Sequence, residues 1–357
     1  MMKKILIIDD SALMRTVLSD IINSDSRFQV VDKAKDGVEG LELLKKNSYD
    51  AVVLDINMPR MDGITLLKEL HKNKIKAKIM MASTDTKEGA KVTMDALDLG
   101  ALDFVHKPDR ASECRGEDFT KHFIDTLAAV ANSRAPMPVR SFSIEEAKES
   151  RKVVELVSKS ASKITGNRIV AIASSTGGPR ALQSVIPKLP KNLKTPVVLV
   201  QHMPEGFTAS LAERLDSLSE VTVKEAAEGD VLAPGCVYIS KGGKHMHIVK
   251  SGSKSVIHYV DGPTREGVRP CANFMYESLM DSDYDEICCV VLTGMGADGT
   301  EGIKNLKSKK KVHVIGQDES TCTVYGMPKA LANAGLVDQV VKLENVAQEI
   351  IMNVGVN

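Results

Sequence analysis

Three residues that could together form a hydrolytic site lie far apart in the sequence: Ser175, His202 and Asp298. Each comes shortly after an apolar run of the kind that forms a strand buried on both faces of a parallel sheet. Because the carboxyl ends of such strands meet along one edge, we expect the three side chains to surround one crevice. A serine hydroxyl becomes nucleophilic when a histidine takes its proton, and a carboxylate can hold the imidazole tautomer. The pattern therefore predicts Ser175 as nucleophile, His202 as base and Asp298 as the group that orients the base.

The segment Ser-Ser-Thr-Gly-Gly-Pro at positions 174–179 predicts a tight turn from strand to helix around Ser175. Proline suits the first helical turn, and glycine allows other groups to approach closely. Backbone N–H groups at such a helix start can hold an oxyanion or a phosphate. Each member of the trio also has an ordinary structural explanation. The serine or the histidine could cap a helix, and the aspartate could form an Asp-Gly turn.

The glycines at positions 294, 296 and 299 offer an alternative, because they have the spacing of a dinucleotide-binding loop. That loop normally occupies the first strand-to-helix turn of its domain, whereas this one comes late. Asp298 would also place a carboxylate inside the loop, where it would repel a pyrophosphate. His245 and His247 could share one face of a strand, but no third metal ligand stands nearby in sequence, so we expect loop or surface histidines there. We therefore favour hydrolysis over nucleotide or metal binding in this part of the chain.

The first 125 residues alternate between short apolar runs and amphipathic stretches. This alternation predicts a five-stranded parallel sheet wrapped by helices. The apolar runs lie at 5–8, 28–31, 51–54, 79–82 and 102–105, and the amphipathic stretches lie at about 12–22, 37–46, 64–72, 89–99 and 119–130.

Polar residues follow the strands of this predicted sheet, at the edge where chemistry gathers. Three of them are the carboxylates of Asp9, Asp10 and Asp55, which would repel one another unless a cation neutralised them. Hard oxygen ligands suit Mg²⁺. Asp10 and Asp55 would bind it directly, together with the backbone carbonyl of Asn57, while Asp9 would act partly through water. The remaining two strand-end residues, Ser83 and Lys107, could then contact a phosphoryl group on Asp55.

This stretch resembles a response-regulator receiver domain along its whole length. The matching residues are the Asp9-Asp10 pair, positions 54–63, Ser83 and Lys107-Pro108. The resemblance implies that Asp55 accepts phosphate from a histidine kinase with the help of Mg²⁺.

Residues 167–357 predict a second, larger doubly wound parallel sheet, so the fold class is α/β with two such domains. Alternating segments at 236–240, 245–250 and 255–260 indicate an antiparallel hairpin inserted into the second domain. Residues 126–166 form a linker in this interpretation. Its proline-containing part at 133–141 should be extended, and a capping-box pattern at Ser143 and Glu146 predicts a helix after it.

The second domain resembles the catalytic domain of the chemotaxis protein-glutamate methylesterases. Ser174 stands where that family usually has alanine, and Cys271 stands where serine is common. The matching stretches lie at 175–178, 201–207, 244–246, 261–263, 269–270, 292–299 and 325–328.

The resemblance implies hydrolysis of glutamyl methyl esters on the cytoplasmic helices of chemoreceptors, which gives adaptation in chemotaxis. Deamidation of receptor glutamines stays open. Ser175, His202 and Asp298 would be the catalytic residues, and the backbone N–H groups of Met295 and Thr176 would stabilise the oxyanion. Ester hydrolysis would need no cofactor. A competing class is a phosphorylation-switched binding module that has lost catalysis.

The composition excludes several other classes of protein. Acidic and basic residues balance at 47 each in 357 residues, so no overall field would recruit nucleic acid or an anionic membrane. The sequence contains no apolar stretch long enough for a signal peptide or a membrane span. Six cysteines without a Cys-x-x-Cys spacing suggest buried, reduced thiols. We therefore expect a soluble cytoplasmic protein that does not insert into the membrane.

Overall fold

The computed structural model describes residues 2–84, 87–108, 110, 113–133 and 166–356. The chain divides into two compact units, residues 1–141 and 142–357. The proline-containing segment and the helix expected after it lie almost entirely outside the described residues.

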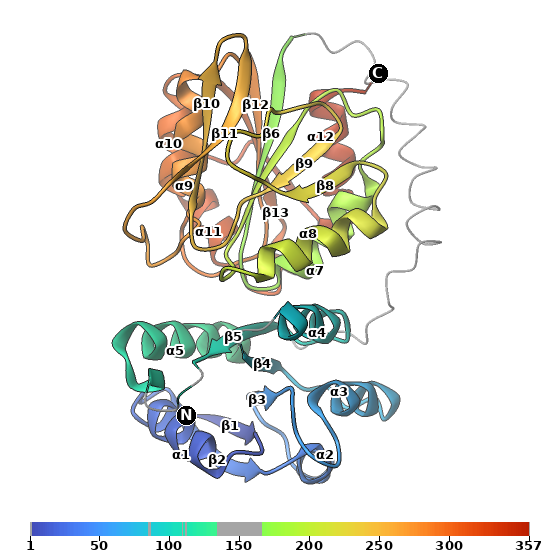
Figure 1. Ribbon diagram of the computed structural model, residues 1–357, viewed down its shortest axis with the longest axis vertical. Helices are drawn as coiled ribbons and strands as arrows, with labels where there is room; N and C mark the ends of the chain where they lie inside the picture. The colour runs from blue at the N-terminus through green and yellow to red at the C-terminus, as the bar shows by residue number, and fades with distance from the viewer. Residues whose placement is uncertain (1, 85–86, 109, 111–112, 134–165, 357) are drawn as a thin grey trace. The chain divides into compact units, whose positions relative to one another are not determined.

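The first unit contains the expected five-stranded parallel sheet, with strand order β2-β1-β3-β4-β5 (Figure 1). Helices α1 and α5 cover one face of the sheet, and α2, α3 and α4 cover the other (Figure 1). The strands are β1 (Lys3–Ile8), β2 (Phe28–Ala34), β3 (Ala51–Asp55), β4 (Ile79–Thr84) and β5 (Asp103–Lys107). The helices are α1 (Ala12–Asn23), α2 (Gly37–Lys46), α3 (Gly63–Lys72), α4 (Lys87–Asp98), the short η1 (Glu113–Arg115) and α5 (Glu117–Asn132).

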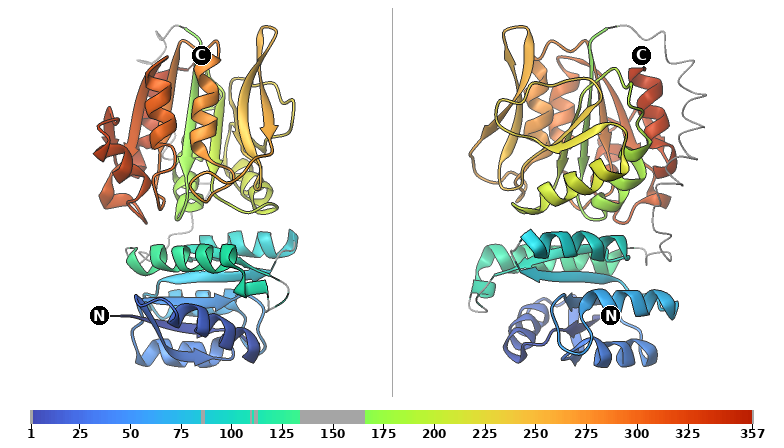
Figure 2. Two further views of the ribbon diagram at one scale, coloured as in Figure 1. Left: turned by 90° about the vertical axis from the view of Figure 1, so that its left-hand side faces the viewer. Right: turned by 45° about the vertical axis from the view of Figure 1, so that its right-hand side comes forward.

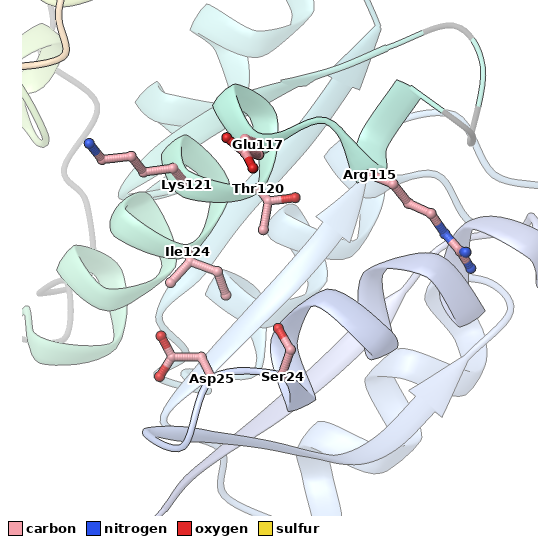
Figure 3. Close-up of a pocket in the computed structure, with 7 residues that line it drawn as sticks. All are labelled: Ser24, Asp25, Arg115, Glu117, Thr120, Lys121 and Ile124. Carbon is pink, nitrogen blue, oxygen red and sulfur yellow. The ribbon is translucent and has the colours of Figure 1, made fainter.

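Helix α5 continues past residue 125, where the sequence pattern set the end of the receiver. Its residues Leu127 and Val130 are fully buried in the core of the first unit, beside Phe123. The whole of α5 therefore belongs to this unit. An open cavity of about 400 Å³ lies between the end of α1 and the start of α5 (Figure 3). Charged side chains of both signs line it, and the predicted phosphoacceptor residues do not.

The second unit contains a seven-stranded, entirely parallel sheet with strand order β14-β13-β12-β6-β7-β9-β8. The strands are β6 (Arg168–Ser174), β7 (Val197–Gln201), β8 (Thr222–Glu225), β9 (Cys236–Ile239), β12 (Glu286–Val291), β13 (Lys311–Gln317) and β14 (Gln339–Val341). The helices are α7 (Gly178–Val185), α8 (Phe207–Leu218), α9 (Ala272–Ser278), α10 (Thr300–Lys307), α11 (Met327–Asn333) and α12 (Val346–Val354), with short 3₁₀ turns η2 (Ile186–Lys188), η3 (Leu279–Asp281), η4 (Glu319–Thr321) and η5 (Leu343–Asn345).

The antiparallel hairpin is also present and projects beside α9 (Figures 1 and 2). It consists of β10 (His245–Ser251) and β11 (Lys254–Val260). Assigning 236–240 to the same hairpin was wrong, because β9 pairs in parallel with both β7 and β8. Val237, Tyr238 and Ile239 are all buried, as expected for a strand covered on both faces.

The order of the strands reverses beside β6, which is the first strand of the second unit. From β6 the chain builds β7, β8 and β9 on one side and then β12, β13 and β14 on the other. A crevice forms beyond the carboxyl ends of the strands at such a switch point. In the register, Ala173 lies opposite Val291 of β12, and Ser174 lies opposite Gln201 of β7. The segments that follow β6, β7 and β12 therefore start side by side.

Within the described part of the chain, no helix is both long and apolar enough to span a membrane.

Candidate active site and phosphoacceptor site

Ser175 is the first residue beyond β6 and lies in the turn that leads into α7. Its N–H donates to the carbonyl of Thr293 at 3.0 Å, and its own carbonyl accepts from the N–H of Gly178 at 2.6 Å. Gly177 has a φ of 76°, a conformation that favours glycine. Gly177 therefore allows the tight turn that the sequence predicts.

The two neighbouring serines have different surroundings. Ser174 is fully buried, and its hydroxyl donates to Oε1 of Gln201 at 2.7 Å. Ser175 is partly exposed. A nucleophilic hydroxyl must be accessible to the substrate, and of the two serines only Ser175 is partly exposed to solvent.

His202 and Asp298 form a hydrogen-bonded pair at this edge of the sheet. Nε2 of His202 lies 2.7 Å from Oδ2 of Asp298, and both side chains are almost completely shielded from solvent. A carboxylate partner keeps the proton on Nε2, so Nδ1 is the nitrogen left to accept a proton. The tautomer is thus assigned from the hydrogen bond.

The Asp298 carboxylate is also held by the start of α9. Oδ2 accepts from the N–H of Ala272 at 2.6 Å, and Oδ1 accepts from the N–H of Asn273 at 2.9 Å. The N–H of Gly299 adds a further bond to Oδ1 at 2.8 Å. Burial alone would raise the pKa of this carboxyl, but His202 and the other donors outweigh it and lower the pKa to about 2. Asp298 is therefore a fixed anion at neutral pH.

The loop after β12 lies against the nucleophile turn. A Cβ atom built on Gly294 would be only 2.7 Å from Cβ of Ser175, so this approach requires glycine. The Gly294 carbonyl accepts from the N–H groups of Gly326 and Met327, which fixes the loop. Among the described residues, nothing accepts a hydrogen bond from the N–H of Met295 or of Thr176. Both donors are therefore available to an oxyanion.

Two residues of this site were not found from the sequence. The Cys271 thiol donates to Oδ1 of Asp298 at 3.0 Å, and burial raises its pKa far above the usual range. The Asn273 side chain accepts from the N–H groups of Gly299 and Gly302, which follow Asp298. The available signal was the position of Cys271 directly after the matched Arg269-Pro270 pair, which could have marked it as a neighbour of the site.

The cysteines of both units and His245 have structural surroundings. All six cysteines are free, five of them buried, and Cys236 partly buried. His245 is buried on β10, donates through Nε2 to the carbonyl of Pro263 at 3.0 Å, and packs edge-on against Phe274. Expecting a loop or surface histidine at 245 was therefore wrong. The described residues assemble no metal-binding group around it.

The first unit brings the predicted acidic residues together at the ends of β1 and β3. Carboxylate oxygens of Asp9, Asp10 and Asp55 all lie within 4.8 Å of one another. Nζ of Lys107, at the end of β5, lies 2.7 Å from Asp55 and 2.9 Å from Asp9. Asn57 is exposed two residues after Asp55. Four of the five strand-end residues, the three aspartates and Lys107, therefore form one cluster of charged groups.

The charges of this cluster perturb one another. Burial raises the pKa of Asp55, and the nearby Lys107 only partly offsets that effect. Burial alone would lower the pKa of Lys107, but attraction to Asp55 and Asp9 outweighs it and raises the pKa. Ser83 is buried at the end of β4, and its hydroxyl accepts from Thr93 at 3.1 Å.

Both units match known families. Residues 170–350 match the family described as "CheB methylesterase", and residues 5–115 match "Response regulator receiver domain". A Pyrococcus abyssi protein named protein-glutamate methylesterase/protein-glutamine glutaminase is 40% identical over 348 residues, 98% of this chain and 92% of that protein. A Bacillus subtilis protein of the same name is 38% identical over 353 residues, 98% of each chain. The solved CheB methylesterase catalytic domain of Thermotoga maritima is 42% identical, covers 54% of this chain and 100% of that one, and gives a TM-score of 0.51.

By fold and site, the chain has the arrangement of a hydrolase unit joined to a response-regulator receiver unit. It belongs to the CheB methylesterase family.

Proposed function

We propose that residues 167–357 hydrolyse glutamyl methyl esters on the cytoplasmic helices of chemoreceptors. The observation that carries this proposal is the His202–Asp298 pair, with Nε2 and Oδ2 2.7 Å apart, at the switch point where Ser175 emerges from β6. The names of the full-length relatives support the same substrate class.

In this mechanism Nδ1 of His202 takes the proton of the Ser175 hydroxyl as its oxygen attacks the ester carbonyl. Asp298 stabilises the imidazolium that results. The oxyanion accepts hydrogen bonds from the N–H groups of Met295 and Thr176, and the loss of one such donor typically costs about 3 kcal/mol. His202 returns the proton to the leaving oxygen, and methanol departs from the acyl-enzyme.

Water then attacks the acyl-enzyme while His202 takes one of its protons. The proton passes to the oxygen of Ser175, which releases a free glutamate side chain and restores the enzyme. A glutamine substrate would follow the same steps with ammonia as the leaving group, which matches the second activity in the relatives' names.

The receiver residues fit a magnesium ion, because three carboxylates with ligand atoms within 4.8 Å of one another offer hard oxygen donors. Asp10 and Asp55 would hold the ion, with the Asn57 carbonyl and, through water, Asp9. A bound Mg²⁺ would neutralise phosphoryl oxygens. The Asp55 carboxylate accepts the phosphoryl group from a histidine kinase, Lys107 pairs with its charge, and the Ser83 hydroxyl donates to it.

Phosphorylation of Asp55 raises the esterase rate in this proposal, and the reaction takes place in the cytoplasm, where the receptor helices lie. Neither nucleic acid nor membrane insertion is part of it. The test is release of methanol from membranes that carry methylated receptors, with and without a small phosphodonor. A fluorophosphonate probe gives an independent readout, because it labels a reactive serine but leaves a pure binding module unlabelled. Absence of both methanol release and labelling would favour the binding module.

A further inference from the structure

The Gln201 side chain connects the two strand ends that carry the proposed nucleophile and base. Ser174 lies opposite Gln201 in the pairing of β6 with β7, so Ser175 and His202 are the first residues beyond it. The His202 N–H donates to the Ser174 carbonyl at 3.1 Å. Nε2 of Gln201 then donates to the carbonyl of Ser175 at 3.0 Å and to that of His202 at 3.1 Å. One carboxamide therefore fixes the distance between the two backbones just where the ladder ends.

Ser174 sets the direction of this carboxamide. Its hydroxyl donates to Oε1 of Gln201 at 2.7 Å, while Nε2 faces the two carbonyls. The opposite orientation would point an oxygen at two carbonyl oxygens and leave the hydroxyl without its acceptor. Gln201 and Ser174 are 2% and 0% exposed, so water cannot readily replace either partner.

We propose that Gln201 is a positioning residue that sets the separation of Ser175 from His202, and that Ser174 acts by orienting the Gln201 amide. The proposal rests on the roles proposed above for Ser175 and His202. Proton transfer between these side chains needs hydrogen-bond geometry, and a displacement of about 1 Å can lower a rate about 100-fold. Because Gln201 bonds the backbone behind the reacting groups, its loss should slow the chemical step without weakening substrate binding.

The experiment compares Gln201→Leu, Ser174→Ala and the double variant with the full-length wild type. The readouts are kcat and KM for methanol release, the rate of fluorophosphonate labelling of Ser175, and the thermal unfolding midpoint. We expect Gln201→Leu to lower kcat and the labelling rate about 10- to 100-fold while KM stays within about twofold. Ser174→Ala should lower both rates about 3- to 10-fold, and it should add nothing further in the Gln201→Leu background.

Tyr238→Phe is the matched control. The Tyr238 hydroxyl is buried, donates to the carbonyl of Val231 and accepts from the N–H of Ala233, so its loss also removes two buried hydrogen bonds. These bonds do not touch the strand ends at the site. The control should unfold at a lower temperature and keep its kcat.

A folded Gln201→Leu protein with wild-type kcat and labelling rate would overturn the positioning role. Were that variant unable to fold, Ser174→Ala would carry the test, because it only shortens a buried side chain. A wild-type labelling rate in Ser174→Ala would then refute the proposal. Absence of both methanol release and labelling in the wild type would instead refute the proposed function, and full activity in Ser175→Ala would refute only the role of Ser175, so these failures are distinguishable.

Discussion

Asp298→Asn is a sharp perturbation, because it changes the charge and donors of the side chain but hardly its shape. Each carboxylate oxygen faces N–H groups. Oδ1 accepts from the backbone of Asn273 and Gly299, and Oδ2 accepts from the backbone of Ala272 and from His202. An amide has only one acceptor oxygen, so its NH₂ group must face donors on one of these two sides.

The structure predicts which side the NH₂ group takes. An NH₂ group at the Oδ1 position would face the N–H groups of Asn273 and Gly299, whereas at the Oδ2 position it would face only the N–H of Ala272. The NH₂ group therefore lies toward His202 and donates to Nε2, which moves the ring proton to Nδ1. That nitrogen can then no longer accept the proton of Ser175. Loss of the correct tautomer costs about 10⁴-fold in kcat, and the unpaired Ala272 N–H costs about 1–3 kcal/mol of stability.

Methanol release from methylated receptor membranes measures this effect, with circular dichroism to confirm that the variant folds. Asp281→Asn is the matched control. The Asp281 side chain is 89% exposed, and its ion pair with Lys309, at 3.8 Å, lies at the surface and contributes little to stability. The control should behave as the wild type. A folded Asp298→Asn enzyme whose kcat stays within about tenfold of the wild type would refute the tautomer argument.

Four further outcomes follow from the same contacts. Ser175→Ala should lower kcat at least about 10⁴-fold and leave the unfolding midpoint unchanged. Ser174→Ala should lower kcat by no more than about tenfold. If the two effects were reversed, Ser174 would be the nucleophile. Asp298 has a pKa of about 2 in the folded protein against an ordinary 3.8. Its ionised carboxylate therefore adds about 2 kcal/mol to the free energy of unfolding above pH 4, and this contribution is lost as the pH falls through 2. Urea unfolding between pH 6 and pH 2 measures this loss, which should be absent from Asp298→Asn. Asp55→Asn should take up no label from a small phosphodonor, and a metal chelator should have the same effect on the wild type; wild-type labelling of the variant would exclude Asp55 as the acceptor. A fragment of residues 167–357 should hydrolyse the ester faster than the unphosphorylated full chain, and its rate should not change when the phosphodonor is added. A folded fragment that is slower than the full chain would show that the receiver assists catalysis.

The strand-end residues were predictable because parallel strands all end at the same edge of their sheet. The five apolar runs were enough to predict that Asp9, Asp55 and Lys107 lie close together, and in the structure Lys107 contacts both aspartates. The same reasoning predicted that His202 and Asp298 would meet. It depends only on the parallel sheet, which continuous apolar runs indicate strongly.

The partners that come from outside the strand ends were not predictable in this way. The N–H groups of Ala272 and Asn273 reach Asp298 because α9 starts beside the loop after β12, and no periodicity in the sequence gives that position. The segment 236–240 was misassigned for a related reason. A strand of four residues, as β9 is, is too short to show from sequence whether one face or both are buried, and β9 is an inner strand only because β8 covers its outer edge.

The two key aspartates show why residue type alone does not define a chemical role. Asp55 and Asp298 both lie at the carboxyl edge of a parallel sheet, and burial disfavours the ionised form of each. Around Asp298, the histidine and the backbone N–H groups more than offset burial, so the pKa falls and the anion is permanent. Around Asp55, the ammonium group of Lys107 and the N–H of Ile56 offset only part of the effect of burial, and the neighbouring Asp9 adds to it, so the pKa rises. A fully satisfied carboxylate suits the fixed task of orienting a base. An incompletely satisfied one suits a group that is to receive a cation and a phosphoryl group from outside.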